Sequence, residues 1–545
     1  MSVSVGKTSI EDDVDYPERR RRIEAQSLPL NLGHLLDASA ADANDRVVLN
    51  FFEAGEQLTY RQLLQRVNKL ANGLLARGMG KGTHVGVMLP NIAAFPISWL
   101  ALARIGAVMV PINTAYTRRE LEFVLATGDV SCLIAHESCM ATVREAQSGK
   151  LPDDRVFVVG AAQGGSQSWE GIGETQPDST PPGAHEVRLS DPLNIQFTSG
   201  TTGFPKGALL SQEYWLVIGK QAAFRDGQAY QRLLASTPFF YMDPQWQLVM
   251  AMYHRATLYV AKRQSASRYM QWVREHRIQF GLLPEIVMKQ PPSVLDTQNE
   301  VIRMNVYGVS KQLHAAIEQR FNLAAREAYG MTEIGSALCA PLEAADTVGT
   351  GSCGVVAPFR EVRIVDEDGA PVATGEVGEL QVRGRGILQS YYKNPEATAA
   401  ALRDGWFRTG DLFRQDERGY FYIVGRIKDM IRRAGENVSA REVEAVIVSV
   451  PEVAEAAVVP VKDELRGEEI KAYIVLRAQT DAAEVLPRLI EHCQSSLAAF
   501  KVPRYFAFLE TLPKTASEKI AKAQLIQQSQ SMQQPSYDRV ASAWI

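Results

Sequence analysis

The sequence predicts an α/β protein with more than one domain, and two observations lead to this prediction. The chain has 545 residues, which is too long for a single hydrophobic core. Its first half alternates short apolar runs with amphipathic stretches, the pattern of an α/β domain with largely parallel sheets. We therefore expect a large α/β domain followed by a smaller unit.

The elements of the large domain can be assigned in order from these patterns. Residues 58–79 carry apolar side chains at helical spacing and end beside glycines, so they predict an amphipathic helix. A strand, a helix and a second strand then form a β-α-β unit. The further expected elements are a helix over 94–105 and strands over 85–89, 107–112, 132–135, 156–159, 235–241 and 257–260. Residues 161–183 are rich in Gly, Ser, Gln and Pro and predict a surface loop.

Composition excludes several classes of protein. A net charge of −4 gives no reason to expect a nucleic-acid partner. Five cysteines without metal-ligand spacing favour a reducing cytoplasm without structural disulfides, and no apolar run is long enough to span a membrane. The charged arm 1–30 and the Gln- and Ser-rich tail 526–545 are expected to be disordered.

The most informative motif starts at Thr198 and ends at Gly207, after an apolar strand over 193–197. Its glycines allow the backbone to approach a ligand closely, and its hydroxyls and N–H groups suit phosphate oxygens. Lys206 adds a mobile positive charge. The order Lys206-Gly207 excludes a Walker A loop, which requires Gly-Lys-Ser/Thr. The candidate phosphate-binding residues are Thr198, Ser199, Gly200, Thr201, Thr202, Gly203 and Lys206.

A second candidate site lies at 326–333. Glu333 offers a carboxylate of the kind that Mg²⁺ binds beside phosphates, and Thr332 can donate to a phosphate. The Tyr329 ring, followed by Gly330, offers a flat face for a purine. From these residues alone, an ordinary strand-to-loop turn with a core tyrosine is the simpler interpretation.

Two polar positions further along have similar alternatives. Asp411 stands in a glycine-flanked turn, where it can accept from two ribose hydroxyls or cap a hairpin. Arg426, after a strand that breaks at Gly425, suits ribose or phosphate oxygens. Ser439 is a good N-cap for a helix over 440–450.

Together, and in this order, these motifs resemble those of the adenylate-forming (AMP-binding) superfamily. That superfamily contains acyl- and aryl-CoA synthetases, luciferases and the adenylation domains of peptide synthetases. The resemblance extends from about Leu32 to about Leu525. It implies a large AMP-binding domain over 31–427, with mostly parallel sheets and a β-barrel-like subdomain. It also implies a hinge at Lys428 and a small mobile α+β domain over 428–525.

The resemblance also implies the reaction. A carboxylic acid, ATP, Mg²⁺ and coenzyme A would be the small-molecule partners, and a homodimer is one expected assembly. Glu333 would hold the metal ion, Asp411 the ribose, and Thr198 and Lys519 would act in catalysis. Gly435, Glu436, Asn437 and Ser439 would contact coenzyme A. Glu518 replaces the glycine that usually precedes Lys519 in the family motif.

Two stretches, 237–245 and 304–310, look most like crotonobetaine/carnitine-CoA ligases. Following the family, the acyl pocket would be lined by Tyr241, Asp243, Gln245, Trp246, Tyr307 and Gly308. Tyr241 stands where the family often has histidine, and 306–308 replaces the usual Gly-Gly-Ala. An apolar acid (aryl, alicyclic or medium-chain) is favoured, because aromatic rings suit it and an Asp-Pro pair usually forms a turn. A quaternary ammonium acid bound by Asp243 is the alternative.

Three other functional classes remain open at this point. They are a luciferase-like oxygenase, an adenylation enzyme that loads a separate carrier protein, and a catalytically silent binding protein. The presence of Lys206, Glu333 and Lys519 favours an active enzyme over the silent protein.

Overall fold

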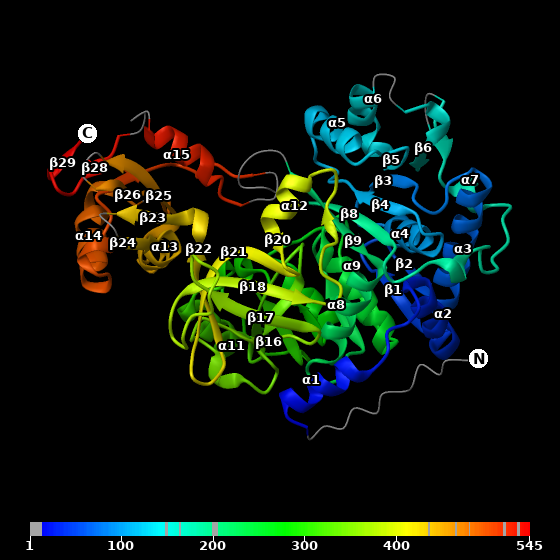
Figure 1. Cartoon of the computed structure of the whole chain (residues 1–545), viewed down its shortest axis with the longest axis horizontal. Helices are drawn as coiled ribbons and strands as arrows, with labels where there is room; N and C mark the ends of the chain where they lie inside the picture. The colour runs from blue at the N-terminus through cyan, green and yellow to red at the C-terminus, as the bar shows by residue number, and fades with distance from the viewer. Residues whose placement is uncertain are drawn as a thin grey trace. The chain divides into compact units, whose positions relative to one another are not determined.

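The computed structural model describes residues 14–147, 151–162, 165–198, 205–433, 436–463, 466–478, 480–515, 519–530 and 535–545. These residues form two compact units (Figure 1). The first comprises the described residues up to Thr198 together with Lys206–Val362 and Val382–Phe407, and the second comprises Arg363–Gln381 and Arg408–Ile545.

The first unit contains a large sheet in which six neighbouring strands run parallel, in the order β1-β11-β10-β12-β13-β14. Antiparallel strands flank them, with β2 at one end and β15 and β16 at the other. The strands are β1 Val47–Phe51, β2 Glu56–Thr59, β10 Arg232–Ala235, β11 Thr257–Val260, β12 Phe280–Leu282, β13 Arg303–Val306, β14 Ala325–Met331, β15 Gly335–Cys339 and β16 Ser352–Val356.

A second sheet of the same unit has the order β19-β9-β8-β4-β3-β5-β6-β7, with β8 to β7 parallel. Its strands are β3 His84–Met88, β4 Val108–Pro111, β5 Cys132–His136, β6 Val156–Val159, β7 Gln167–Ser168, β8 Pro192–Thr198, β9 Lys206–Ser211 and β19 Ser390–Tyr391. The prediction of mostly parallel sheets is therefore confirmed.

Helices cover these sheets with apolar faces. Leu121 and Val124 of α5 and Met140 and Val143 of α6 pack with Leu133 of β5 in one core, and Figure 1 shows both helices beside this strand. The helices of this unit are α1 Tyr16–Ala25, α2 Leu32–Ala43, α3 Tyr60–Ala76, α4 Ala94–Arg104, α5 Arg118–Thr127, α6 Met140–Gln147, α7 Glu170–Gly173, α8 Gln212–Phe224, α9 Met242–His254, α10 Tyr269–Glu275, α11 Lys311–Phe321 and α12 Pro395–Ala401.

The second unit is built around a sheet with the order β24-β23-β26-β27-β28-β29, with β25 paired to β26. The strands of this sheet are β23 Met430–Arg433, β24 Glu436–Ser439, β25 Val453–Asp463, β26 Gly467–Leu476, β27 Tyr505–Phe508, β28 Tyr537–Asp538 and β29 Ala543–Trp544. The same unit also contains β22 Phe421–Arg426, which pairs with β21. The strands β17 Arg360–Val365, β18 Gly378–Gly384 and β21 Trp406–Gln415 each run from one unit into the other, and the short β20 Leu402–Arg403 pairs with β21.

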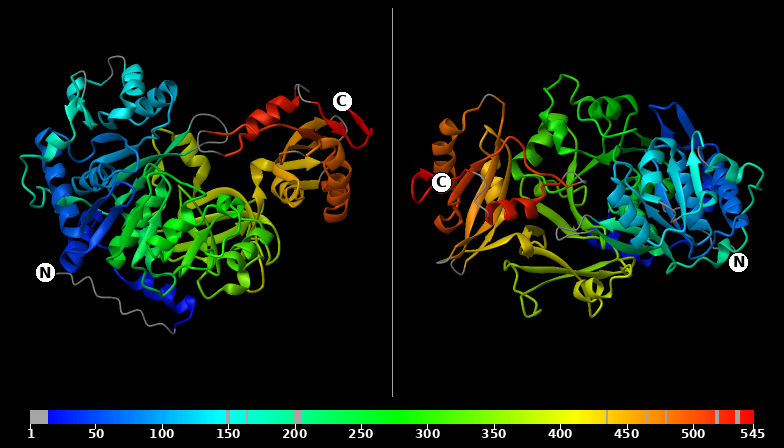
Figure 2. Two further views of the ribbon diagram at one scale, coloured as in Figure 1. Left: turned by 180° about the vertical axis from the view of Figure 1, so that it is seen from behind. Right: turned by 90° about the horizontal axis from the view of Figure 1, so that it is seen from above.

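Both faces of this smaller sheet are covered. Ala456 and Val458 face a core that includes α13 Ala440–Val448 and α14 Ala482–Ser496. Ala457 and Val459 face the other core, beneath α15 Lys522–Gln530. Because residues of β25 alternate between two apolar cores, this strand is apolar without interruption over several residues. Figure 2 shows α14 and α15 on opposite sides of the sheet.

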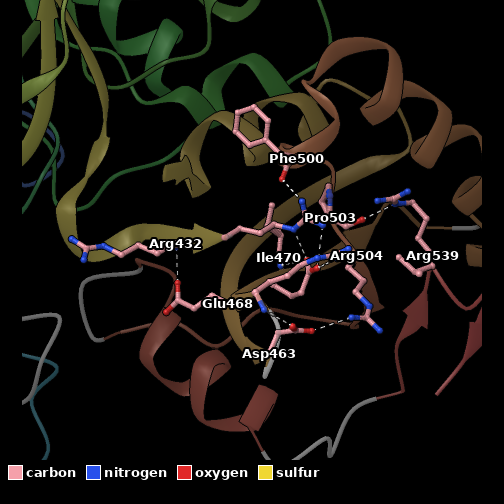
Figure 3. A network of polar contacts seen from close by, with 12 residues as sticks. Arg432, Asp463, Glu468, Ile470, Phe500, Pro503, Arg504 and Arg539 are labelled. Atoms are coloured by element: carbon pink, nitrogen blue, oxygen red, sulfur yellow. Dashed lines mark hydrogen bonds and ion pairs between the residues drawn. The ribbon is translucent and has the colours of Figure 1, made fainter. Parts of the chain in front are cut away.

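The expectation of disorder at the two ends needs correction for the described residues, which include the helix α1 and the strands β28 and β29. Tyr16, in α1, is buried, and its hydroxyl donates to the carbonyl oxygen of Val356 at 3.0 Å. At the other end β28 pairs with β27, and Arg504 lies between Asp463 (3.1 Å) and Asp538 (3.0 Å). Figure 3 shows Arg504 beside Asp463, with Arg539 donating to the carbonyl oxygen of Pro503. Contacts with residues far away in the sequence order the described parts of both segments, which local composition cannot reveal.

One predicted strand, 235–241, is wrong beyond its first residue. β10 ends at Ala235, and the chain then turns so that Tyr241 becomes the N-cap of α9. The side chain of Asn91 fixes this turn by accepting from the N–H of Phe239 at 2.8 Å. The apolar residues 239 and 240 are buried in a turn, which period-two patterning cannot distinguish from a strand.

All five cysteines are buried, and none forms a disulfide. Burial raises the pKa of Cys132 to about 12 and that of Cys493 to about 11. Among the described residues, no helix is sufficiently long and apolar to cross a membrane.

Candidate active site

The candidate residues of the first unit lie where strands end. Thr198 ends β8, Tyr307 and Gly308 follow β13, and Glu333 follows β14. Crevices outside the carboxyl ends of parallel strands are where ligands bind in open α/β sheets. The topology therefore places Thr198 at the carboxyl end of a strand of one sheet, and Tyr307, Gly308 and Glu333 at the carboxyl ends of strands of the other.

The two ends of the predicted phosphate-binding loop, residues 198–207, are fixed by strand pairing. Thr198 of β8 pairs with Lys206 of β9, and its hydroxyl donates to the carbonyl oxygen of Lys206 at 3.4 Å. A Cβ on Gly207 would lie 2.6 Å from Cγ2 of Ile195, so only glycine fits here. The predicted phosphate ligands Ser199, Gly200, Thr201, Thr202 and Gly203 lie outside the described residues.

Glu333 and Lys206 meet the same tyrosine. The Tyr391 hydroxyl donates to Oε1 of Glu333 at 2.8 Å, and Nζ of Lys206 lies 4.7 Å from the centre of the Tyr391 ring. Glu333 is only 5% exposed. Burial, together with the Glu333 charge and this hydrogen bond, raises the pKa of Tyr391 well above its usual value. The hydroxyl therefore stays protonated and holds the carboxylate in place.

The sequence analysis did not identify Tyr391. It belongs to β19, nearly sixty residues beyond Glu333, and it reaches the site because β19 pairs with β9. The pair Tyr391-Tyr392 beside polar residues carries no local signal of this role. Only the sheet order brings it to the carboxylate.

The segment before Glu333 is shaped by Gly330. A Cβ on Gly330 would lie 2.3 Å from the carbonyl oxygen of Gly335, which excludes every other residue. A bulge in the ladder lies between Tyr329 and Gly330. Tyr329 is buried, and Thr332 is half-buried beside Glu333.

Of the residues predicted to line the acyl pocket, Gln245 and Asp243 belong to the start of α9, whereas Tyr307 and Gly308 follow β13. Gln245 is fully buried and donates to the carbonyl oxygens of Phe239 and Tyr241, so its side chain fixes the turn. Asp243 accepts from Nε1 of Trp246 at 3.1 Å within the first turn of α9. Burial raises the pKa of Asp243, and this hydrogen bond opposes the rise.

Tyr307 lies within electrostatic reach of Asp243. Burial and the Asp243 charge raise the pKa of the Tyr307 hydroxyl to about 12, although the side chain as a whole is 49% exposed. The next residue, Gly308, donates its N–H to Oε1 of Glu327 at 2.5 Å, which ties the end of β13 to β14. Glu327 was not singled out from the sequence.

In the second unit, Asp411 and Arg426 face each other on β21 and β22. Nε of Arg426 lies 2.9 Å from Oδ1 of Asp411, which is only 2% exposed. The Thr409 hydroxyl accepts from the N–H of Asp411 at 3.1 Å and fixes the turn. The Asp411 carboxylate, which is predicted to bind the ribose, is therefore buried and oriented by Arg426.

The predicted hinge and coenzyme A segment adjoin this pair. Lys428 is exposed in the short turn Ile427–Asp429. Ser439 caps α13 as expected and also donates to the carbonyl oxygen of Val424 at 2.7 Å. A Cβ on Gly425 would lie 2.7 Å from Oγ of Ser439, which explains that glycine. Glu436 is exposed; Gly435 and the side chain of Asn437 lie outside the described residues.

Lys519 is exposed at one end of a short loop. Its carbonyl oxygen accepts from the N–H of Thr515 at 2.7 Å, and its own N–H donates to Oγ1 of Thr515 at 3.3 Å. Lys514 and Ile520 form a β-bridge that closes the loop. Glu518, the departure from the family pattern, lies outside the described residues.

The donor set fits a magnesium ion at Glu333. No group of three or more His, Cys, Asp or Glu side chains suitable for a metal occurs among the described residues. Mg²⁺ does not require such a group, because it is usually held by one or two carboxylates and by substrate phosphates. A buried, oriented carboxylate near Lys206 and the ends of the phosphate loop meets this requirement.

Comparison with known proteins agrees with this geometry. Residues 36–392 match the family model described as AMP-binding enzyme, and residues 442–519 match the AMP-binding enzyme C-terminal domain. A crotonobetaine/carnitine–CoA ligase from Salmonella paratyphi C (strain RKS4594) is 32% identical over 516 residues, covering 91% of this chain and 98% of that protein.

Solved structures share the fold. The anthranilate CoA ligase AuaEII, in complex with anthranoyl-AMP, superposes with a TM-score of 0.84 at 23% identity, covering 93% of this chain and 98% of that one. A Mycobacterium tuberculosis fatty acyl CoA synthetase gives 0.71 at 27% identity (92% and 99%). The o-succinylbenzoate CoA synthetase of Bacillus subtilis, in complex with ATP and magnesium ion, gives 0.78 at 24% identity (90% and 98%). The chain therefore belongs to the AMP-binding enzyme family and is an adenylate-forming acid–CoA ligase.

Proposed function

We propose that this ligase joins a carboxylic acid to coenzyme A in two half-reactions. The acid carboxylate attacks the α-phosphorus of ATP, which forms acyl-AMP and releases pyrophosphate. The thiol of coenzyme A then attacks the acyl carbon, which forms the thioester and releases AMP. The observation that carries this proposal is the Lys206–Tyr391–Glu333 arrangement, because one tyrosine contacts both a cation at the end of the predicted phosphate-binding loop and a buried carboxylate.

Each residue has a proposed role. Both reactants of the first step are anions, so fixed positive charges lower its barrier. Lys519 bridges the acid carboxylate and the α-phosphate, Thr198 and Lys206 bind departing phosphate oxygens, and Asp411 binds the ribose with Arg426. Tyr329 stacks on the adenine. Glu333 and substrate phosphates would hold Mg²⁺, which supplies charge neutralisation when bound.

The second step uses the C-terminal domain. We propose a boundary at Lys428, with a large domain over 31–427 and a mobile domain over 428–525. Rotation about this residue withdraws Lys519 and presents residues 435–439 to coenzyme A. The buried, unbridged thiols support a cytoplasmic location. A homodimer remains a prediction.

We propose an aryl, alicyclic or medium-chain acid as the substrate. The supporting observation is the hydrogen bond from Trp246 to Asp243, which engages the only predicted anionic group of the acyl segment within its own helix turn. Tyr241, Trp246 and Tyr307 then provide flat surfaces for apolar atoms.

A carnitine-type acid is the second candidate, and two observations favour it. The Salmonella relative is a crotonobetaine/carnitine–CoA ligase. In addition, burial raises the pKa of Asp243, so a cationic ligand beside this group would stabilise its ionised form.

Pyrophosphate release over a panel of acids, with and without coenzyme A, tests the proposal. We expect acid-dependent release with aryl, alicyclic or medium-chain acids, and thioester only when coenzyme A is present. Turnover of carnitine or crotonobetaine alone would select the second candidate. A thioester formed only on an added carrier protein would instead indicate a carrier-loading enzyme.

A further inference from the structure

Alternate residues of β13 form a polar row that leads to the carboxyl end of this strand, where a ligand is expected to bind. Arg303 and Asn305 share one face of the strand, and Tyr307 continues this row just beyond its end. Met304 and Val306 point the other way, into an apolar core. Arg303 and Asn305 are 0% and 1% exposed, whereas Tyr307 is 49% exposed. A buried polar row thus ends in an accessible phenol.

The buried part of this row contains an excess of positive charge. Asp226 accepts from Nη1 of Arg303 at 2.7 Å and from the Tyr230 hydroxyl at 2.8 Å. Arg225 is also buried, with its Nε 3.8 Å from Asp226. Two guanidinium groups therefore share one carboxylate, and they require further acceptors.

Asn305 supplies that acceptor, which fixes the orientation of its amide. Its Oδ1 accepts from Nε of Arg303 at 2.7 Å and from Nη2 of Arg225 at 2.9 Å. A flipped amide would place an NH₂ group against two cationic donors, so the flip is excluded. Nδ2 must therefore point the other way, where it donates to the Tyr307 oxygen at 3.2 Å.

This orientation determines the polarity of Tyr307. Because the phenol oxygen accepts from Asn305, its proton is directed elsewhere. Within the part of the chain that the structure describes, no group accepts it; Asp243, the nearby anion, accepts from Trp246. A pKa of about 12, caused by burial and by the Asp243 charge, keeps the proton in place at neutral pH. Tyr307 thus presents a fixed hydrogen-bond donor just beyond the carboxyl end of β13.

We propose that the substrate acid carries a neutral hydrogen-bond acceptor in its otherwise apolar acyl group, such as a carbonyl or ether oxygen, and that Tyr307 donates to it. Asn305 is a positioning residue that sets the direction of the donor. This inference rests on the proposed function. A substrate without the acceptor would cover the Tyr307 donor and leave it unpaired, which enzymes built to bind a polar group discriminate against.

Isosteric pairs of acids that exchange an ether oxygen for a methylene provide the test. Suitable pairs are 4-methoxybenzoate with 4-ethylbenzoate, tetrahydropyran-4-carboxylate with cyclohexanecarboxylate, and 5-methoxypentanoate with heptanoate. The ratio of kcat/KM within a pair is measured by pyrophosphate release. For the pair whose size fits, we expect the parent to prefer the ether by about 10- to 100-fold.

Two variants and a matched control identify the residues responsible. Tyr307→Phe removes the donor, and the ratio should fall to about 1. In Asn305→Asp, one oxygen still accepts from the arginines, and the other accepts the Tyr307 proton, so this ratio should also fall to about 1. The new carboxylate balances the second guanidinium, so the melting temperature should not fall. Tyr230→Phe removes a hydroxyl from the same network without touching Tyr307 and should keep the ether preference.

The outcomes separate this inference from the proposed function. Turnover of both members of every accepted pair at equal rates would contradict the inference and leave the ligase activity intact. Retention of the preference in Asn305→Asp would show that Asn305 does not direct the donor. Failure of every acid to release pyrophosphate would overturn the proposed function, and the inference with it.

Discussion

The candidate groups at the strand ends of the first unit differ sharply from those in the loops of the second. Glu333 is buried and held by the Tyr391 hydroxyl, and the Tyr307 hydroxyl is held by Asn305. Lys428 and Lys519 have exposed side chains on short turns. The first set is positioned by the fold itself. The second set is exposed to solvent rather than buried among partners, so the two sets should respond differently to substitution.

The largest expected effect on the reaction rate comes from replacing Lys519. Lys519→Ala removes a charge aimed at the first transition state, so adenylate formation should fall about 100- to 1000-fold. Thioester formation from supplied acyl-AMP should be spared. Single-turnover assays of each half-reaction measure this, with Lys514→Ala, on the same loop and paired with Glu455, as control. Equal losses in both half-reactions would contradict the assignment.

Lys428→Pro tests the proposed hinge and should produce the opposite pattern. Proline fixes one backbone angle and restricts the preceding residue, so rotation should be blocked. Adenylation should persist while thioester formation is largely lost. An unchanged steady-state rate of coenzyme A ligation would exclude this residue as the hinge.

A smaller effect is expected where a buried partner only orients a functional group. Tyr391→Phe removes the donor to Glu333 but keeps the ring beneath Lys206. The Mg²⁺ concentration for half-maximal activity should rise about tenfold, the low end for loss of a supporting hydrogen bond. Tyr392→Phe is the matched control, because its hydroxyl binds Asp129 at the surface. Similar behaviour of both variants would remove Tyr391 from the site.

The smallest effect concerns Asp243. Because burial raises its folded-state pKa, ionisation costs stability as the pH rises from its unfolded value through its folded value. Asp243→Asn should therefore be more stable than the parent at pH 7, on the order of 1 kcal/mol, and equal below about pH 4. Thermal unfolding at both pH values measures this. A variant less stable than the parent at pH 7 would show that the carboxylate is favourably paired.

Much of the first unit could be predicted because its signals are local. The strand over 156–159 and that over 257–260 were predicted to the residue. In the second unit, Ser439 caps the expected helix. A Cβ at Gly207, Gly330 or Gly425 would lie under 3 Å from a neighbouring atom. The sequence analysis assigned Gly207 a different role, close approach of the backbone to a ligand.

The rest depended on contacts between distant parts of the chain. Tyr391 reaches Glu333 through the pairing of β19 with β9, and no pattern near either residue encodes this. Arg303 and Asn305 look like ordinary polar interruptions of a strand. Their importance follows from Asp226 and Arg225, nearly eighty residues earlier, which make the row buried and charged. The described parts of the two ends, which were expected to be disordered, form α1, β28 and β29 for the same reason.

Because every cysteine is buried, the native thiols of the folded chain should react slowly with thiol reagents. Alkylation requires the thiolate, and Cys132 and Cys493 hold their protons far above neutral pH. A cysteine introduced on an exposed residue of each unit would therefore be labelled against a low background. Spin labels or fluorophores at two such positions would report the separation of the two units through the catalytic cycle, without first removing any native thiol.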